Sequence, residues 1–111
     1  MSSQSTDFRV SPETMAELRD LERTSDIEDV LTIFKALSDE HRLDIMRFLD
    51  VSELCVCDLV EIFDIEYSKL SYHLKQLKEA NLVTADRDGN YVTYRPTDRG
   101  EEVIDIIHRI Y

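Results

Sequence analysis

The feature that most constrains the fold is a change of apolar pattern late in the chain. Residues 11–80 carry apolar side chains at the three- and four-residue spacing of helices. Residues 82–85 and 91–94 are instead β-prone, and the Asp-Gly-Asn signal between them predicts a hairpin. Helical spacing resumes after Thr97. The sequence therefore predicts a mainly α fold that contains one β-hairpin before its last helix.

Capping residues divide the helical part into separate helices. Ser11, which precedes a Pro, opens a short first helix, and Ser25 opens the second with a capping box. Later starts are predicted after Ser38, Ser52 and Thr97, with a further helix over residues 67–80. The short helix after Ser52 and the helix over residues 67–80 form a helix-turn-helix, and the hairpin is its wing. The expected architecture is a winged helix-turn-helix.

The length of 111 residues suits one domain. We assign residues 25–111 to a winged helix-turn-helix DNA-binding and dimerisation domain. Residues 1–24 form an N-terminal arm with a short helix. No apolar run approaches the roughly 18 residues that span a bilayer, and the first residues lack the pattern of a secretory signal. We expect a cytoplasmic protein without a membrane partner, whose thiols stay reduced.

The net charge of −11 would ordinarily argue against a nucleic-acid partner. Its distribution changes that conclusion. Residues 67–95 carry 5 basic and 3 acidic side chains, whereas the rest of the chain carries 8 basic and 21 acidic ones. The stretch with a net positive charge is the predicted recognition helix and wing. Double-stranded DNA is therefore the expected partner of this surface.

Both cysteines lie in the heptapeptide ELCVCDL, residues 53–59. In a reducing compartment such a pair suggests metal binding or redox sensing before a structural disulfide. A helix that begins after Ser52 would place Cys55 in its first turn, where the helix N-terminus stabilises a thiolate. Residues two apart on a regular helix point about 200° apart. We therefore expect that the helix must unwind before one ion, or a disulfide, can join Cys55 and Cys57.

Four segments together resemble the ArsR/SmtB family of winged-helix, metal-sensing repressors. They are ALSDEHRLDIMRFL (36–49), ELCVCDL (53–59), SKLSYHLKQLKEANLV (68–83) and DGNYVTYRPT (89–97). They occur in the family's order, and the resemblance covers about residues 25–111. The segment 53–59 is similar to the metal box of the arsenic, cadmium and lead sensors. The resemblance implies a homodimeric repressor with Cys55 and Cys57 as metal ligands.

The resemblance leaves the ligand set for the ion incomplete. Cadmium and lead sensors of the family draw further cysteines from the N-terminal arm, but residues 1–30 contain neither Cys nor His. Two thiolates are too few for a closed zinc site. Trivalent arsenic or antimony can accept two sulfurs plus an oxygen or an external thiol, and monovalent copper also suits a thiolate pair. Arsenite or antimonite is the expected inducer, and no cofactor is expected for folding.

The predicted DNA contacts come from the recognition helix and the wing. We expect hydroxyls of the helix to meet base edges and Lys75 and Lys78 to meet phosphates. The imidazole of His73 is expected to support packing or to contact DNA. The full set is Tyr67, Ser68, Lys69, Ser71, Tyr72, His73, Lys75, Gln76 and Lys78 on the helix, with Arg87, Asn90 and Arg95 on the wing.

The last helix is too apolar to be left in water, so we predict that it packs against a second subunit. The proposed dimer interface is formed by Phe34, Leu37, Ile104, Ile107 and Tyr111. The histidines outside the recognition helix are interpreted without metal. We expect His41 to cap its helix or face solvent, and His108 to lie on a solvated acidic face.

The sequence hypothesis is a DNA-binding transcriptional repressor that leaves its operator when Cys55 and Cys57 capture trivalent arsenic or antimony. Two alternatives stay open at this point. The same scaffold could use the thiols as a dithiol redox switch, or the acidic winged helix could be a protein–protein interaction module. No His or Asp/Glu constellation near either cysteine suits catalysis, so we predict that the chain is not an enzyme.

Overall fold

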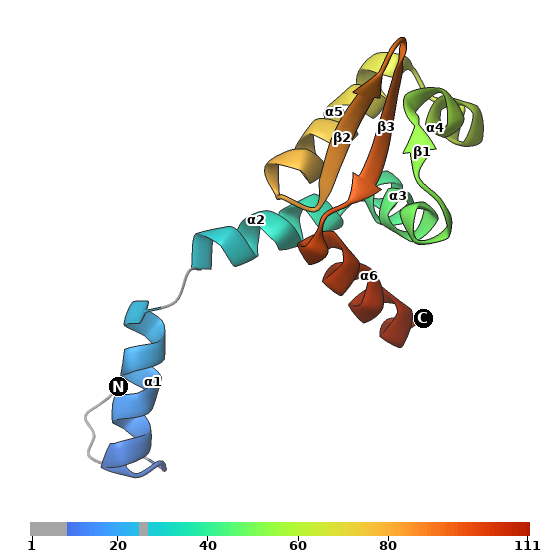
Figure 1. Ribbon diagram of the computed structural model, residues 1–111. Coiled ribbons are helices and arrows are strands. Elements are labelled where there is room, and N and C mark those ends of the chain that lie inside the picture. The colour runs from blue at the N-terminus through green and yellow to red at the C-terminus, as the bar shows by residue number, and fades with distance from the viewer. Residues whose placement is uncertain (1–8, 25–26) are drawn as a thin grey trace.

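The computed structural model of the chain describes residues 9–24 and 27–111. Its elements are α1 (Pro12–Thr24), α2 (Ile27–Leu37), α3 (Glu40–Val51), β1 (Leu54–Cys55), α4 (Val56–Phe63), α5 (Tyr67–Glu79), β2 (Val83–Asp88), β3 (Tyr91–Pro96) and α6 (Asp98–Ile110) (Figure 1). The predicted order of helices, hairpin and last helix is confirmed. Helices α4 and α5 form the helix-turn-helix, and β2 and β3 form the wing.

The wing contains one strand more than the hairpin that the sequence predicts. Strand β1 pairs antiparallel with β3, with Leu54 opposite Tyr94 and Cys55 opposite Thr93, so the strand order is β1-β3-β2. Strands β2 and β3 are joined by a tight turn in which Gly89 has a positive φ of 64°. The pairing of β1 ties the segment before α4 to the wing.

The hydrophobic core lies where α3, α4, α5 and α6 meet the base of the wing. Its largest fully buried side chains are Ile45, Met46, Leu59, Leu70, Leu74, Leu77 and Leu82. Gly100, in the first turn of α6, allows a close approach to the α5–β2 connection. A Cβ at this position would lie 2.0 Å from the carbonyl oxygen of Leu82. The core thus fixes α5, and with it the recognition surface, against the rest of the domain.

Two predicted helix starts are confirmed by their hydrogen bonds. The hydroxyl of Ser11 accepts from the backbone N–H of Thr14 at 3.1 Å, and the hydroxyl of Thr97 accepts from the N–H of Gly100 at 3.0 Å. The predicted start at Ser25 lies outside the described residues.

Two other predicted starts are wrong. Helix α3 is capped by Asp39, whose carboxylate accepts from the N–H of Arg42 at 3.1 Å, and not by Ser38. Helix α4 is capped by Cys55, and not by Ser52. The reason for the second error is that the residues after Ser52 extend to pair with β3 before the helix begins.

Helix α1 projects away from the body of the domain, and none of its residues is buried (Figure 1). Within the described ranges, the helices are too short or too polar to cross a membrane.

Candidate functional site

The exposed surface of α5 carries most of the predicted DNA contacts. Tyr67 and Tyr72 are 65% and 56% exposed. The remaining exposed positions are Ser68, Lys69, Lys75 and Lys78, while Ser71 and Gln76 are half-buried. The structure therefore leaves eight of the nine predicted helix residues at or near the surface, where a nucleic acid could reach them.

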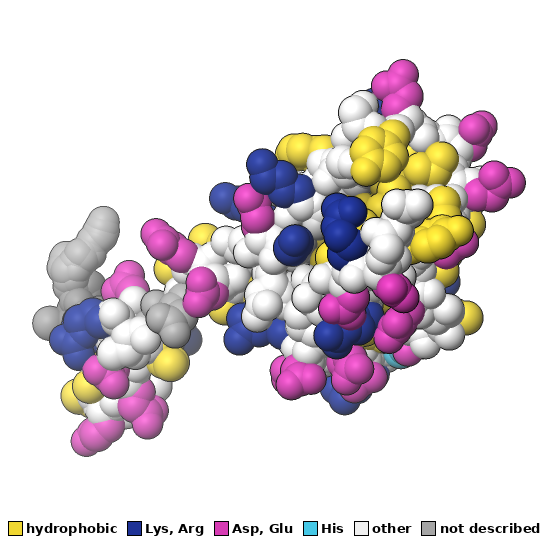
Figure 2. Space-filling model, turned by 45° about the horizontal axis from the view of Figure 1, so that its top comes forward, with side chains coloured by type: hydrophobic (Ala, Val, Ile, Leu, Met, Phe, Trp, Pro, Cys, Tyr) yellow, Lys and Arg dark blue, Asp and Glu magenta, His cyan; other side chains and the backbone are white. Residues whose placement is uncertain are grey.

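A cleft of about 460 Å³ separates this helix from the wing. Lys75, Lys78 and Arg87 line it together with polar groups of Ser71 and Tyr67. Burial raises the pKa of Tyr94, which also lines the cleft, so its hydroxyl keeps its proton. Figure 2 shows Lys and Arg side chains gathered on one face of the body, among acidic side chains. Three cations around one cleft suit an anionic backbone.

The predicted wing residues differ in whether their side chains are free to contact a phosphate or are already paired within the protein. Arg87 and Asn90 are exposed near the tip of the hairpin. Arg95 donates from Nε to the carboxylate of Asp86 across the strands at 2.7 Å, and this bond raises the pKa of Arg95. Because its charge is already paired, Arg95 is a weaker candidate for a phosphate contact than Arg87.

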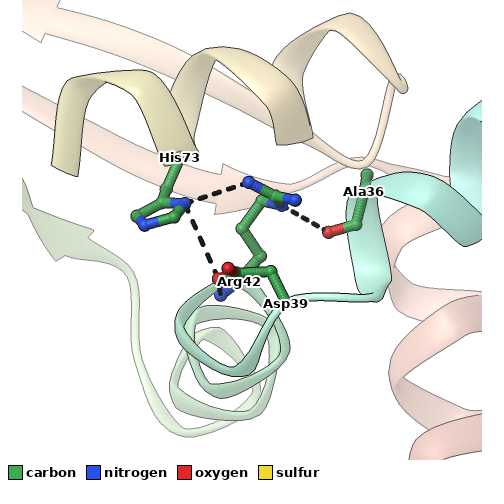
Figure 3. A network of polar contacts seen from close by, with 4 residues as sticks. All are labelled: Ala36, Asp39, Arg42 and His73. Atoms are coloured by element: carbon green, nitrogen blue, oxygen red, sulfur yellow. Dashed lines mark hydrogen bonds and ion pairs between the residues drawn. The ribbon is translucent and has the colours of Figure 1, made fainter. Parts of the chain in front are cut away.

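His73 is the predicted helix residue that the structure turns inward (Figure 3). Its side chain is 12% exposed, and its Nδ1 lies 3.0 Å from Nη1 of Arg42 and 3.6 Å from Oδ2 of Asp39. Arg42 also donates from Nε to the carbonyl of Ala36 at 2.6 Å. This polar network joins the end of α2, the start of α3 and the middle of α5. Of the two roles expected for His73, packing or DNA contact, these contacts favour packing that positions α5.

The network favours a neutral His73. Burial lowers the pKa of His73, and the nearby Arg42 lowers it further against the opposing pull of Asp39. A neutral ring can accept the Arg42 hydrogen bond at Nδ1. Burial raises the pKa of Asp39, but the hydrogen bond from the backbone N–H of Arg42 and the positive charge of the Arg42 guanidinium lower it, and the net pKa of Asp39 is lowered.

His41 is half-buried and packs against two aromatic rings, whereas the cap of its helix is Asp39. Its ring lies 5.0 Å from that of Phe63 and 5.2 Å from that of His73. One potential ligand atom each of Asp39, His41 and His73 lies within 4.8 Å of the others. The guanidinium of Arg42 is in contact with His73, and its positive charge opposes a metal ion at this cluster.

The two cysteines are joined as a disulfide between Cys55 and Cys57, whose Cα atoms are 5.3 Å apart. This distance is ordinary for a disulfide. Cys55 has extended backbone angles, φ −86° and ψ 165°, and the helix begins at Val56. The expectation that α4 must unwind before the sulfurs can meet is therefore wrong. One sulfur is placed by the extended segment and the other by the first turn of the helix.

Asp58 shares this site with the cysteines, and sequence reasoning missed it. The N–H of Asp58 donates to Sγ of Cys55 at 3.3 Å, and the N–H of Cys55 donates to Oδ2 of Asp58 at 3.0 Å. One carboxylate oxygen and the two sulfurs all lie within 4.8 Å of one another. The available signal was the spacing, since an acidic residue three positions after a cap is typical of a capping box.

The predicted dimer residues divide into a buried and an exposed group. Ile104 and Ile107 are 4% and 7% exposed and belong to the core of the chain itself. Phe34 is 62% exposed, and Leu37 is half-buried. Tyr111 is 70% exposed, and its ring lies 4.3 Å from the guanidinium carbon of Arg47.

An apolar groove of about 510 Å³ runs between α2 and α6. Phe34, Leu37 and Ile107 line it with Ile106 and Ile110, which are 52% and 79% exposed. Ile106 and Ile110, together with Val30, are exposed apolar residues of this groove that the predicted dimer set does not include. His108 is not on a purely solvated face, because its Nε2 lies 2.5 Å from Oδ2 of Asp50 on α3.

Comparison with known proteins places these features in a family. Residues 39–85 match the family described as "Bacterial regulatory protein, arsR family". The chain is 52% identical over 71 residues to the arsenical resistance operon repressor of Bacillus subtilis (strain 168), covering 63% of this chain. It is 34% identical over 84 residues to the cadmium resistance transcriptional regulatory protein CadC homolog of Staphylococcus aureus, covering 75% of this chain and 68% of that protein. The chain belongs to the ArsR family.

The structural comparison agrees with this membership. The structure of reduced HlyU from Vibrio cholerae N16961 matches with a TM-score of 0.72 and 28% identity, over 82% of this chain and 97% of that one. The predicted ArsR family and winged helix-turn-helix fold are therefore confirmed. The segment matched to the family, residues 39–85, contains both cysteines and all of α5. The match to the Bacillus subtilis repressor spans 66% of that protein's length.

Proposed function

We propose that this chain is a cytoplasmic transcriptional repressor, and not an enzyme, that binds an operator in double-stranded DNA as a homodimer. Capture of a thiophilic ion by Cys55 and Cys57 releases the operator. The observation that carries this proposal is the position of the thiol pair. The pair lies where strand β1, which extends the wing sheet, meets α4, the first helix of the helix-turn-helix.

The DNA-binding surface is supported by shape and charge together. Tyr67, Ser68 and Tyr72 on the exposed face of α5 supply donors and acceptors for base edges. Lys75, Lys78 and Arg87 border the cleft between α5 and the wing and suit a phosphate backbone. The acidic remainder of the chain repels DNA, which restricts binding to this face.

The coupling between ion and operator follows from the two elements that the thiols join. Strand β1 is paired with β3 of the wing, and α4, which begins directly after Cys55, packs on the recognition helix α5. An ion that sets a new spacing between the sulfurs moves β1 against the start of α4. The distance between the wing and α5 then changes. Allosteric coupling of about 1–3 kcal/mol, or roughly 5–150-fold in affinity, suffices for release.

The donor set favours a three-coordinate trivalent ion. The sequence contains two cysteines, and the nearest further ligand in the described residues is the carboxylate of Asp58. Two sulfurs and one oxygen suit arsenite or antimonite, whereas structural zinc sites use four ligands. Relatives named for arsenical and for cadmium resistance both support an ion as the signal.

One observation favours a second candidate function, a dithiol redox switch. The structure holds Cys55 and Cys57 as a disulfide without disturbing α4, so oxidation is sterically possible at this site. The family match gives no support to the third interpretation, a protein–protein interaction module.

One binding experiment separates these functions. An operator is selected from a random duplex pool with the reduced protein, and its affinity is measured with arsenite, antimonite, cadmium, zinc or peroxide. The proposal expects release by arsenite and antimonite under reducing conditions and little effect of zinc. Release by peroxide alone would establish the redox switch instead. If no operator is enriched at low salt, the repressor assignment is wrong.

A further inference from the structure

The carboxylate of Asp58 is placed as a third group around the cysteine pair. It is fixed from one side, because Oδ2 accepts the N–H of Cys55 at 3.0 Å. A carboxylate offers about four acceptor positions, and this bond uses one of them. Asp58 and Cys57 are both exposed, so an ion can arrive from solvent without opening the core. One Asp58 oxygen lies within 4.8 Å of each sulfur.

We propose that Asp58 is the third contact of the trivalent ion: the ion keeps one hydroxyl group, and the Asp58 carboxylate accepts a hydrogen bond from it. This inference rests on the proposed function, and it deepens that function by naming the chemical form of the ion that the site selects. Hydroxide-bearing arsenite and antimonite fit the site fully. An organoarsenical, whose third position is taken by carbon, does not use Asp58.

The binding step balances without a change of oxidation state. A phosphine reductant first supplies the two electrons that open the Cys55–Cys57 disulfide, and one water molecule supplies the two thiol protons and leaves its oxygen on the phosphorus. Arsenite, As(OH)₃, then exchanges two hydroxyls for the two thiols. Two As–S bonds form, two As–O and two S–H bonds break, and two water molecules leave. The arsenic stays trivalent and retains one hydroxyl, whose proton points to Asp58.

The geometry explains why this role goes to Asp58 and not to another acid of α4. Glu61 is also exposed, but it lies one turn further along the helix and is outside the cluster of ligand atoms. Asp58 is held next to the sulfurs by the same pair of hydrogen bonds that caps the helix. Little side-chain entropy is therefore lost when the Asp58 carboxylate accepts the hydrogen bond from the hydroxyl of the bound ion.

The test compares two arsenicals on one reduced protein. Calorimetry with a phosphine reductant measures the affinity of the full chain for arsenite and for phenylarsine oxide. The variants are Asp58→Asn, which keeps the shape and an acceptor but loses the charge, and Glu61→Gln as the matched control. We expect Asp58→Asn to weaken arsenite binding by about tenfold, the lower range for a hydrogen bond to a charged group. Phenylarsine oxide binding should stay within about twofold in both variants.

The two ligands make the result decisive, because phenylarsine oxide reports whether the dithiol itself is intact. Unchanged arsenite affinity in Asp58→Asn would overturn the proposal. Equal weakening of both arsenicals would also overturn it, since Asp58 would then act only through the helix cap. If the wild-type chain binds neither arsenical, the proposed function fails as well, which is a different result from a loss confined to Asp58.

Discussion

Replacing Arg42 with Met removes two hydrogen bonds that join three helices. Nε donates to the carbonyl of Ala36 on α2 at 2.6 Å, and Nη1 lies 3.0 Å from Nδ1 of His73 on α5. Hydrogen bonds from charged groups contribute about 1.5–3 kcal/mol each when buried. Both are only partly buried here, so we expect Arg42→Met to cost about 2–4 kcal/mol of unfolding free energy in total.

The assay is urea unfolding followed by circular dichroism, with operator binding measured on the same samples. The midpoint should fall while the slope m stays constant, because the unfolded surface is unchanged. Operator affinity should fall as well, since α5 loses its tie to α2 and α3. Arg47→Met is the control. Its pair with Asp44 is 3.4 Å long and exposed and its other contact is the ring of Tyr111, so about 1 kcal/mol is expected.

A double-mutant cycle with His73→Asn isolates the pair. The coupling energy between Arg42 and His73 should be about 0.5–3 kcal/mol. If Arg42→Met changes stability by no more than the control does and leaves operator affinity intact, the network does not position the recognition helix.

Three further predictions concern pH, salt and assembly. The pKa of His73 is lowered below 6.5 in the folded chain, so the unfolded chain takes up the proton at a higher pH than the folded chain does. The stability that His73 contributes is therefore fully present above pH 6.5 and is lost as the pH falls toward the folded-state pKa. Urea midpoints measured against pH should show this loss, and His73→Asn should reduce it. Lys75→Ala should reduce the slope of log affinity against log salt by about 0.9 on any duplex, as salt titrations would show. Phe34→Glu, at a 62% exposed position, should leave a folded monomer in sedimentation and weaken operator binding; an unchanged dimer would exclude this groove as the interface.

The parts of the fold that the sequence predicted are those set by local pattern. Leu70, Leu74 and Leu77 follow helical spacing, and all three are buried on α5. Thr97 caps α6 as its side chain predicts. The tight turn at Gly89 follows from a dipeptide that accepts positive φ.

The start of α4 could not be found in this way, because it depends on a contact far along the chain. Ser52 is a good local cap, but residues 54–55 pair with residues 93–94. A strand of two residues shows no alternation that a pattern could detect. Because the helix begins at Val56, Cys55 is an extended cap and does not lie in the first turn. The two sulfurs can therefore meet without unwinding of α4, contrary to the prediction.

The burial of His73 was within reach of the sequence. It stands three residues after Leu70 and four before Leu77, on the same helical face as the core leucines. The pairing of His73 with Arg42 could not be predicted, because 31 residues separate the two in the chain. In α6, apolar residues occupy both faces, so spacing alone could not distinguish the buried Ile107 from the exposed Ile106.

Cys55 and Cys57 are proposed to act together when an ion releases the operator. The most direct test of this joint action is operator affinity of the reduced chain with and without arsenite, for the wild type, Cys55→Ser and Cys57→Ser. Each Ser variant should bind the operator within about threefold of the wild type, because Ser is close in size and can still cap α4. Each should lose the response to arsenite, because a single thiolate cannot chelate. Arsenite-dependent release that persists in both Ser variants would contradict the claim and place the sensor elsewhere.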